Sequence, residues 1–299
     1  MELKLYDVKK FSSIRQMLQM AVADAGDKPA FKYVDGKEII TVTYSDFYKD
    51  TLYLGTALLN LGVLSCHVGC IGQNSYTWLT AYLTSLCGDG VFVPVDKELP
   101  AKDIINVVNH SDTEAIFYDK KYDKIFRENR ELMPNVKYFI GFSSEDDDGC
   151  FLSYNKLIES GKESYNAGNH SYEEKRSEPN DLKMLIYTSG TTGMSKGVML
   201  TEHNLCCSVI CGLQVSRVYT RSLSVLPYHH TYEAVSGILV SLHNHCCICI
   251  NSNLKAVVKN LQLFKPDFIY VVPAFAELFY KKIWATVKQS GKEKGLKFL

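Results

Sequence analysis

Residues 187–199 read Tyr-Thr-Ser-Gly-Thr-Thr-Gly-Met-Ser-Lys-Gly-Val-Met. Glycine lacks a side chain and adopts positive φ angles, so several backbone amides of this stretch can turn toward one anion. Lys196 adds a mobile positive charge suited to a phosphate. The hydroxyl groups add further donors, from Thr188, Ser189, Thr191 and Thr192. The stretch therefore predicts a loop that holds the phosphate tail of a nucleotide triphosphate.

The spacing excludes two common phosphate loops. The P-loop of NTPases places Gly-Lys-Ser/Thr four residues after its first glycine. Here Ser195 precedes Lys196 and Gly197 follows it, so the pattern fails at two positions. A G-x-G-x-x-G pattern, typical of dinucleotide-binding proteins and kinases, is absent from this stretch.

The surrounding sequence alternates between strand and helix patterns. Residues 182–187 predict a strand that enters the loop, residues 198–200 leave it, and a helix begins after Thr201 and runs to about Ser216. Further strands are predicted over 222–227, 246–250 and 268–272, with helices over 232–242, 254–264 and 274–289. Such alternation indicates layered parallel β-sheets flanked by helices, whose ligands bind beyond the carboxyl ends of the strands.

The first half has the same rhythm without a catalytic motif. Helices are predicted over 46–61, 76–87 and 101–110, and strands over 68–72, 90–95 and 115–118. Residues 159–181 are polar and predict a linker or a long surface connection. We therefore expect two α/β subdomains: a scaffold over residues 1–178, and residues 179–299 with the phosphate loop.

The loop resembles the signature of the adenylate-forming enzymes, Tyr/Phe-Thr-Ser-Gly-Ser/Thr-Thr-Gly-x-Pro-Lys-Gly-Val. The only departure is Ser195, where that superfamily usually has proline, and it removes no phosphate donor. A polar surface loop without a ligand is the alternative, and a match this long argues against it. A second segment, Leu-Pro-Tyr-His-His-Thr-Tyr-Glu over residues 226–233, resembles another core motif of these enzymes and places His230 on their histidine. Val272-Pro273 followed by an amphipathic helix is similar to long-chain fatty-acid–CoA ligases.

The resemblance implies a fold like the large N-terminal domain of adenylate-forming enzymes and a two-step reaction. A carboxylic acid, here a fatty acid, reacts with ATP to give an acyl adenylate, and coenzyme A then gives a thioester. Mg²⁺ would assist with the phosphates. His230 would orient the carboxylate. The pyrophosphate contacts would be Thr188, Ser189, Gly190, Thr191, Thr192, Gly193 and Lys196.

Two other functions stay open at this point. The chain could belong to an amino-acid or aryl-acid adenylation domain that feeds a carrier protein. It could also be a non-catalytic nucleotide-binding domain that keeps the loop without the remaining machinery. The acid that stimulates turnover would separate the first from a fatty-acid ligase.

Relatives of this kind carry further functional elements downstream, among them the Tyr-Gly-x-Thr-Glu segment, the ribose-binding Asp and a small C-terminal domain with a catalytic Lys. The sequence shows none of these, so we expect an N-terminal portion that is incomplete at its C-terminal end. Without those elements, nucleotide binding should be weak and most adenylation activity lost.

Composition narrows the class of protein. The chain has 299 residues, 46% hydrophobic and 22% charged, and its formal net charge is zero. A net charge of zero gives no reason to expect nucleic acid as a partner. The N-terminus lacks the layout of a signal peptide, which suggests a cytoplasmic protein. The uncharged stretch 68–88 contains three glycines and predicts a strand, a loop and a buried helix rather than a transmembrane segment. Peripheral membrane contact and the oligomeric state stay open.

Two clusters contain residue types that can bind metal ions, but the spacing of their residues does not favour a metal site. The ten cysteines include three in His-Asn-His-Cys-Cys-Ile-Cys over residues 243–249. Neighbouring residues on a strand point to opposite faces, so Cys246 and Cys247 cannot easily share one ion, and buried thiols are favoured. The acidic run over 145–148 predicts a solvated turn. We therefore expect no metal site built by these residues.

Overall fold

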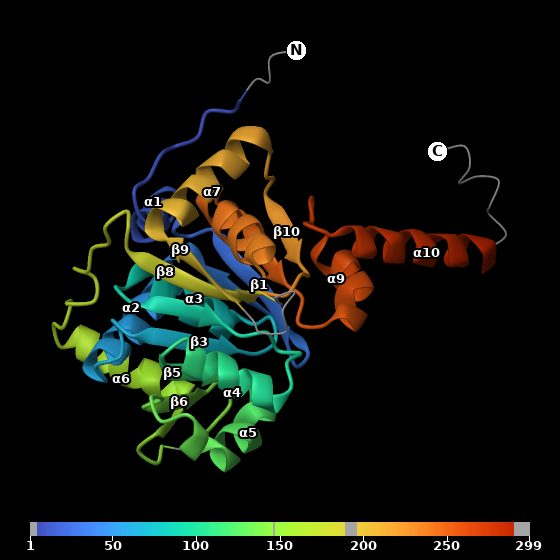
Figure 1. Ribbon diagram of the computed structural model, residues 1–299. Helices are drawn as coiled ribbons and strands as arrows, with labels where there is room; N and C mark the ends of the chain where they lie inside the picture. The colour runs from blue at the N-terminus through green and yellow to red at the C-terminus, as the bar shows by residue number, and fades with distance from the viewer. Residues whose placement is uncertain (1–4, 146, 189–195, 290–299) are drawn as a thin grey trace.

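The structure is a computed structural model that describes residues 5–145, 147–188 and 196–289 (Figure 1). It contains two β-sheets with helices packed against them. The prediction of layered parallel sheets flanked by helices is confirmed.

The larger sheet has seven strands in the order β7-β6-β5-β3-β4-β8-β9. Its neighbours are parallel except for β8 and β9, which pair antiparallel. A parallel pair needs a long crossover connection, and the link between β8 and β9 is too short for one. The strand bounds are β3 (His67–Ile71), β4 (Val91–Pro94), β5 (Thr113–Tyr118), β6 (Tyr138–Gly141), β7 (Phe151–Ser153), β8 (Leu182–Thr188) and β9 (Lys196–Thr201).

The smaller sheet has four strands in the order β10-β11-β1-β2. β10, β11 and β1 are parallel, whereas β1 and β2 form an antiparallel hairpin. Gly36 occupies the turn of that hairpin with φ +57°, a conformation that glycine adopts without strain. The bounds are β1 (Pro29–Asp35), β2 (Glu38–Thr43), β10 (Arg221–Ser224) and β11 (Cys247–Ile250).

Most long helices begin after a serine or threonine that caps them. Ser13, Thr43, Ser75, Ser153 and Thr201 each accept a hydrogen bond from a backbone amide of the first turn. The helices that follow these caps are α1 (Ile14–Ala25), α2 (Tyr44–Asn60), α3 (Tyr76–Cys87), α6 (Tyr154–Asn166) and α7 (Glu202–Val215). The others are α4 (Ala101–His110), α5 (Asp123–Glu128), α8 (Val240–His243), α9 (Val257–Phe264) and α10 (Pro273–Gln289).

Short helical turns of other kinds complete the fold. Three 3₁₀ turns cover Lys120–Tyr122, Arg130–Leu132 and Leu254–Ala256. A π-helix covers Tyr232–Leu239 and leads directly into α8. Sequence periodicity predicted an ordinary helix here, and the wider turn is a finding of the structure.

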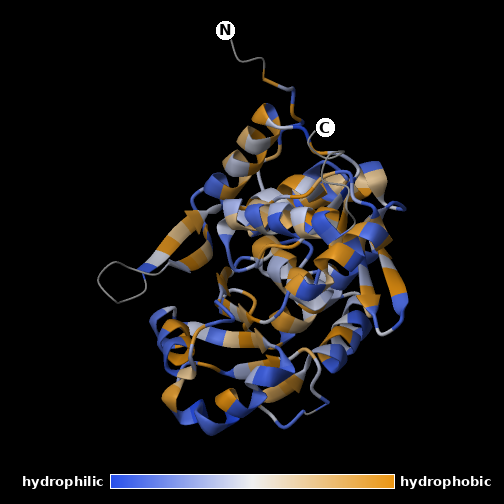
Figure 2. Cartoon of the chain, turned by 90° about the vertical axis from the view of Figure 1, so that its right-hand side faces the viewer, coloured by the Kyte–Doolittle hydropathy of each residue, from blue (hydrophilic) through white to orange (hydrophobic). Residues whose placement is uncertain are grey.

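The largest buried cluster joins both sheets to α1, α2, α3, α7 and α8. A second cluster packs α4 and α5 onto the larger sheet, and a third joins β10 and β11 to α9. The strands carry many hydrophobic residues, and the helices carry both hydrophobic and hydrophilic ones (Figure 2). Within the described ranges, no helix combines the length and apolar composition needed to cross a membrane.

The structure departs from the sequence-based predictions in two further places and leaves a third untested. Residues 268–272 are not a strand, because only Phe268 bridges to β10 before the chain turns away toward Pro273. The polar range 159–181 is not a linker throughout, since α6 extends to Asn166 and Tyr172 is buried. Both sheets draw strands from either side of residue 178, so the sheets do not divide there, and the two subdomains stay a prediction.

Candidate functional site

The glycine-rich stretch connects the antiparallel strands β8 and β9. Thr188 and Lys196 are register partners at the end of this hairpin, and both are exposed. Among the described residues, Lys196 forms no ion pair, so its ammonium group is available to an anion. Ser189, Gly190, Thr191, Thr192 and Gly193 lie outside the described residues.

The second motif forms a turn between β10 and the π-helix. Its two histidines differ: His229 is buried and His230 is exposed, and their ring centroids lie 4.3 Å apart. Nε2 of His229 lies 3.3 Å from Oδ1 of Asp96. Burial lowers the pKa of His229 to about 4 against the opposing pull of Asp96, so the ring is neutral at pH 7. Asp96 is therefore a close polar neighbour of a neutral imidazole rather than the partner of an ion pair.

Asn74 holds this turn from the other half of the chain. It lies after β3, is 5% exposed, and spans Pro227 with two hydrogen bonds. Its Nδ2 donates to the carbonyl oxygen of Leu226 (2.7 Å), and its Oδ1 accepts from the amide of Tyr228 (3.3 Å). A buried side chain amide thus connects the larger sheet to the turn that carries both histidines.

A cavity of about 380 Å³ opens beside this turn. It is lined by residues that follow β3, β4, β10 and β11, and by Phe275 of α10. His229, His230, Asn74 and Lys97 contribute polar groups to it. Both sheets therefore turn strand ends toward one cavity, where parallel α/β folds bind ligands.

Lys97 is a lysine of the cavity lining. Its Nζ donates a hydrogen bond to Oε1 of Gln73 (2.6 Å), and burial lowers its pKa. Sequence analysis singled out neither Lys97 nor Asn74. The signal was nonetheless present, because both follow predicted strands at the carboxyl end, where ligand groups gather.

The described residues contain no group of three or more His, Cys, Asp or Glu side chains placed to hold a metal ion. All ten cysteines are free thiols, and Cys246, Cys247 and Cys249 are buried. In the acidic run, Asp148 lies 3.5 Å from Arg127 and accepts a hydrogen bond from the amide of Phe151.

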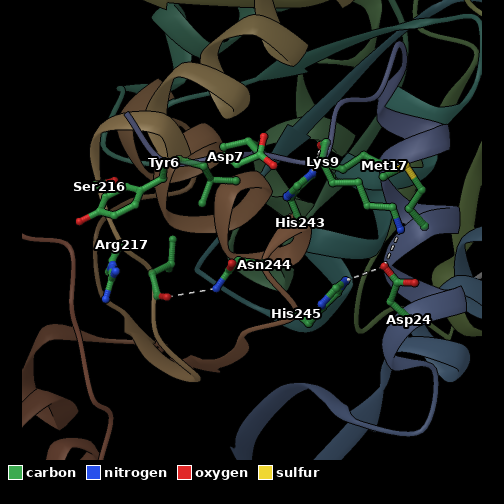
Figure 3. A pocket seen from close by; sticks show the side chains of 14 residues that line it. Tyr6, Asp7, Lys9, Met17, Asp24, Ser216, Arg217, His243, Asn244 and His245 are labelled. Carbon is green, nitrogen blue, oxygen red and sulfur yellow. Dashed lines mark hydrogen bonds and ion pairs between the residues drawn. The ribbon is translucent and has the colours of Figure 1, made fainter. Parts of the chain in front are cut away.

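A second cavity, of about 330 Å³, lies beneath the N-terminal segment (Figure 3). Two of its lining side chains approach one carboxylate: Lys9 Nζ lies 2.8 Å from Asp24 Oδ2, and His245 Nε2 lies 3.7 Å from the same oxygen. Nε2 of His243 lies 2.8 Å from the carbonyl oxygen of Lys9. These contacts attach the N-terminal segment to α1 and α8, and none of the predicted site residues lines this cavity.

The model of the AMP-binding enzyme family matches residues 18–298. The chain belongs to this family. The matched range includes both the hairpin and the residues that line the cavity.

Curated relatives are fatty-acid ligases. Long-chain-fatty-acid–CoA ligase 5 of Rattus norvegicus is 25% identical over 94% of this chain and 44% of its own length. Long chain acyl-CoA synthetase 4 of Arabidopsis thaliana is 25% identical over 95% of this chain and 45% of its own. The chain thus spans less than half the length of these relatives.

A solved structure supports the fold of this AMP-binding region. The adenylation and carrier didomain of a carboxylic acid reductase from Segniliparus rugosus, in complex with AMP, has a TM-score of 0.81 at 16% identity. The structural match covers 93% of this chain and 45% of the reductase chain.

Proposed function

We propose that this chain is the phosphate-holding portion of an AMP-forming acid–thiol ligase. The enzyme would join a carboxylic acid, a fatty acid in the first instance, to ATP as an acyl adenylate. It would then pass the acyl group to coenzyme A. The observation that carries this proposal is the match of the AMP-binding enzyme family to residues 18–298, a range that includes Lys196 and the His229–His230 turn.

The residues of the hairpin fit the phosphate groups of ATP. Thr188 offers a hydroxyl donor and Lys196 a cation at the same end of the hairpin, and Lys196 forms no ion pair with another described residue. Lysine binds phosphate as a point charge on a flexible stem. Together with Ser189, Gly190, Thr191, Thr192 and Gly193, they would hold the leaving pyrophosphate and neutralise its charge. No described cluster of acidic groups fits Mg²⁺, so no step is assigned to the ion here.

His230 would orient the carboxylate. Its ring is exposed beside the cavity, whereas His229 is held by Asp96 underneath it. A histidine in this position can donate a hydrogen bond to one carboxylate oxygen and aim the other at the α-phosphate. His229 stays neutral and packs against the ring of His230, which limits the directions that the second ring can take.

The acid and the compartment are inferred from indirect features. The curated relatives named above act on long-chain fatty acids by their names, which favours a fatty acid over an aryl or amino acid. Free thiols at all ten cysteines suit a reducing compartment such as the cytoplasm. The partners are small molecules: the acid, ATP and coenzyme A.

The test substitutes Lys196→Ala in the full-length protein that contains this chain. Losing a charged phosphate contact should raise the KM for ATP roughly tenfold or more, measured by carboxylate-dependent ATP–pyrophosphate exchange. Lys37→Ala is the matched control, because Lys37 is also an exposed lysine beside a hairpin turn, but in the smaller sheet. An unchanged KM for ATP in Lys196→Ala would remove this lysine from the phosphate site.

A further inference from the structure

A buried carboxyl group lies directly behind the histidine turn. Glu233 is 1% exposed, and its Oε1 accepts a hydrogen bond from Oγ of Ser224 at the end of β10. Its other oxygen, Oε2, has no hydrogen-bond partner among the described residues. Ser224 Oγ also lies 3.3 Å from the hydroxyl of Tyr228, so the carboxyl group ends a chain of polar groups that starts within the turn.

The main chain of Glu233 is tied to His230. The amides of Glu233 and Ala234 both donate to the carbonyl oxygen of His230, at 3.1 and 3.0 Å. Glu233 is thus fixed at two points. Its backbone holds the residue that carries the exposed imidazole, and its side chain holds the strand from which the turn departs.

The π-helix provides the space for this arrangement. A Cβ atom at Gly237 would lie 2.6 Å from Cδ of Glu233, so the carboxyl group rests directly on a glycine. Single π-turns often occur at functional sites because they redirect side chains that an α-helix would point elsewhere. A Glu side chain that folds back over its own helix to reach Ser224 is a redirection of this kind.

Burial raises the pKa of Glu233 to about 8, so the group is neutral at pH 7. The titratable groups that face it are the hydroxyls of Tyr228 and Tyr270, and neither supplies a positive charge. A neutral carboxyl group can keep its hydrogen bond to Ser224 without a buried charge. A polar atom without a partner in a core costs stability, and an apolar side chain of similar size would avoid that cost.

We propose that Glu233 is a positioning residue: its link to Ser224 and its backbone contact with His230 set the place of His230 for the carboxylate of the substrate. Asn74 holds the start of the same turn around Pro227, and Glu233 holds its end. This inference rests on the proposed function, since it assigns a purpose to the placement of His230.

The test compares four forms of the full-length protein that contains this chain: wild type, Glu233→Gln, Glu233→Leu and Ser241→Ala. Gln keeps an acceptor for Ser224, whereas Leu fills a similar volume without one. Ser241 is a fully buried hydroxyl in α8 with no partner among the described residues, so it controls for the loss of a nearby buried polar group.

The first readout is the NMR titration of the imidazole of His229. We expect Glu233→Leu to raise the pKa of His229 from about 4 toward its ordinary value of 6.5, because a displaced turn admits water. The second readout is ATP–pyrophosphate exchange, in which Glu233→Leu should raise the KM for the acid roughly tenfold and leave the KM for ATP unchanged. Glu233→Gln and Ser241→Ala should match wild type in both.

The proposal is overturned if Glu233→Leu leaves the His229 titration unchanged, or if the titration moves while the KM for the acid does not. If wild type shows no exchange with any acid but the titration still moves in Glu233→Leu alone, the positioning of the turn is supported. The proposed function then fails instead.

Discussion

Two adjacent histidines receive different surroundings and therefore different chemistry. His229 is buried against Asp96 and stays neutral, while His230 faces the cavity. The motif in the sequence pointed to His230 by resemblance, but it could not show the asymmetry. Asp96, Asn74 and Glu233 create that asymmetry, and the first two are distant in sequence, so only tertiary packing brings them to the turn.

At Asn74 we predict a loss of stability. Asn74→Ala leaves the carbonyl of Leu226 and the amide of Tyr228 without partners in a buried place. An unsatisfied buried group costs roughly 1–3 kcal/mol, so the free energy of unfolding should fall by about that amount. Urea unfolding followed by circular dichroism measures it. A loss no greater than that of Asn60→Ala, which removes two hydrogen bonds on the surface, would contradict this role of Asn74.

At Glu233 we predict a specific pH dependence of stability. Its pKa is raised from 4.5 to about 8 in the folded protein, so the unfolded chain releases this proton first. Stability from this group is full below pH 4.5 and is lost as pH rises toward about 8. As pH rises from 5 to about 8, the unfolding midpoint should therefore fall less for Glu233→Gln than for the wild type. Parallel pH curves for the two proteins would show that Glu233 is not buried as described.

At the scale of elements, helix-capping residues allowed the bounds of helices to be predicted from the sequence. The helix predicted over 76–87 is observed as Tyr76–Cys87, because Ser75 caps its start and Gly88 follows its end. Thr201 begins α7 as predicted, with Asn204 completing a capping box. The strand predicted over 268–272 failed because apolar composition alone does not provide a partner, and only Phe268 pairs with β10.

The acid in the first turn of α7, Glu202, connects several elements of the fold. Glu202 is fully buried, and its Oε1 accepts a hydrogen bond from the amide of Ile14 (2.6 Å). Its Oε2 lies 3.8 Å from Nζ of Lys183 on β8, which donates to the carbonyl of Gly88 (2.6 Å). This buried pair connects the hairpin strand β8 to α1, α3 and α7.

We predict that breaking this pair destabilises the fold strongly. Lys183→Met leaves the Glu202 carboxylate buried without a countercharge, which typically costs 3–5 kcal/mol. The double variant Lys183→Met with Glu202→Gln should recover part of that loss, because it removes the stranded charge. A double-mutant cycle measured by urea unfolding gives the coupling. Additive losses would mean that the two groups do not interact.

At the scale of the whole molecule, the site exists because two sheets end at one place. The segments that follow β3 and β4 of the larger sheet and β10 and β11 of the smaller sheet each contribute residues to one cavity. Strand alternation predicted parallel sheets, but not that β1 pairs with β11 across most of the chain. The order of strands in a sheet depends on contacts between residues that are distant in sequence, and the local hydrophobic pattern does not encode these contacts.

We propose that the protein to which this chain belongs forms an acyl adenylate. Carboxylate-dependent exchange of pyrophosphate into ATP tests it most directly, with Mg²⁺ and a panel of fatty, aryl and amino acids. We predict exchange stimulated by fatty acids above the others. No exchange with any acid, from a folded protein that still binds ATP, would contradict the claim and leave a nucleotide-binding domain without adenylation chemistry.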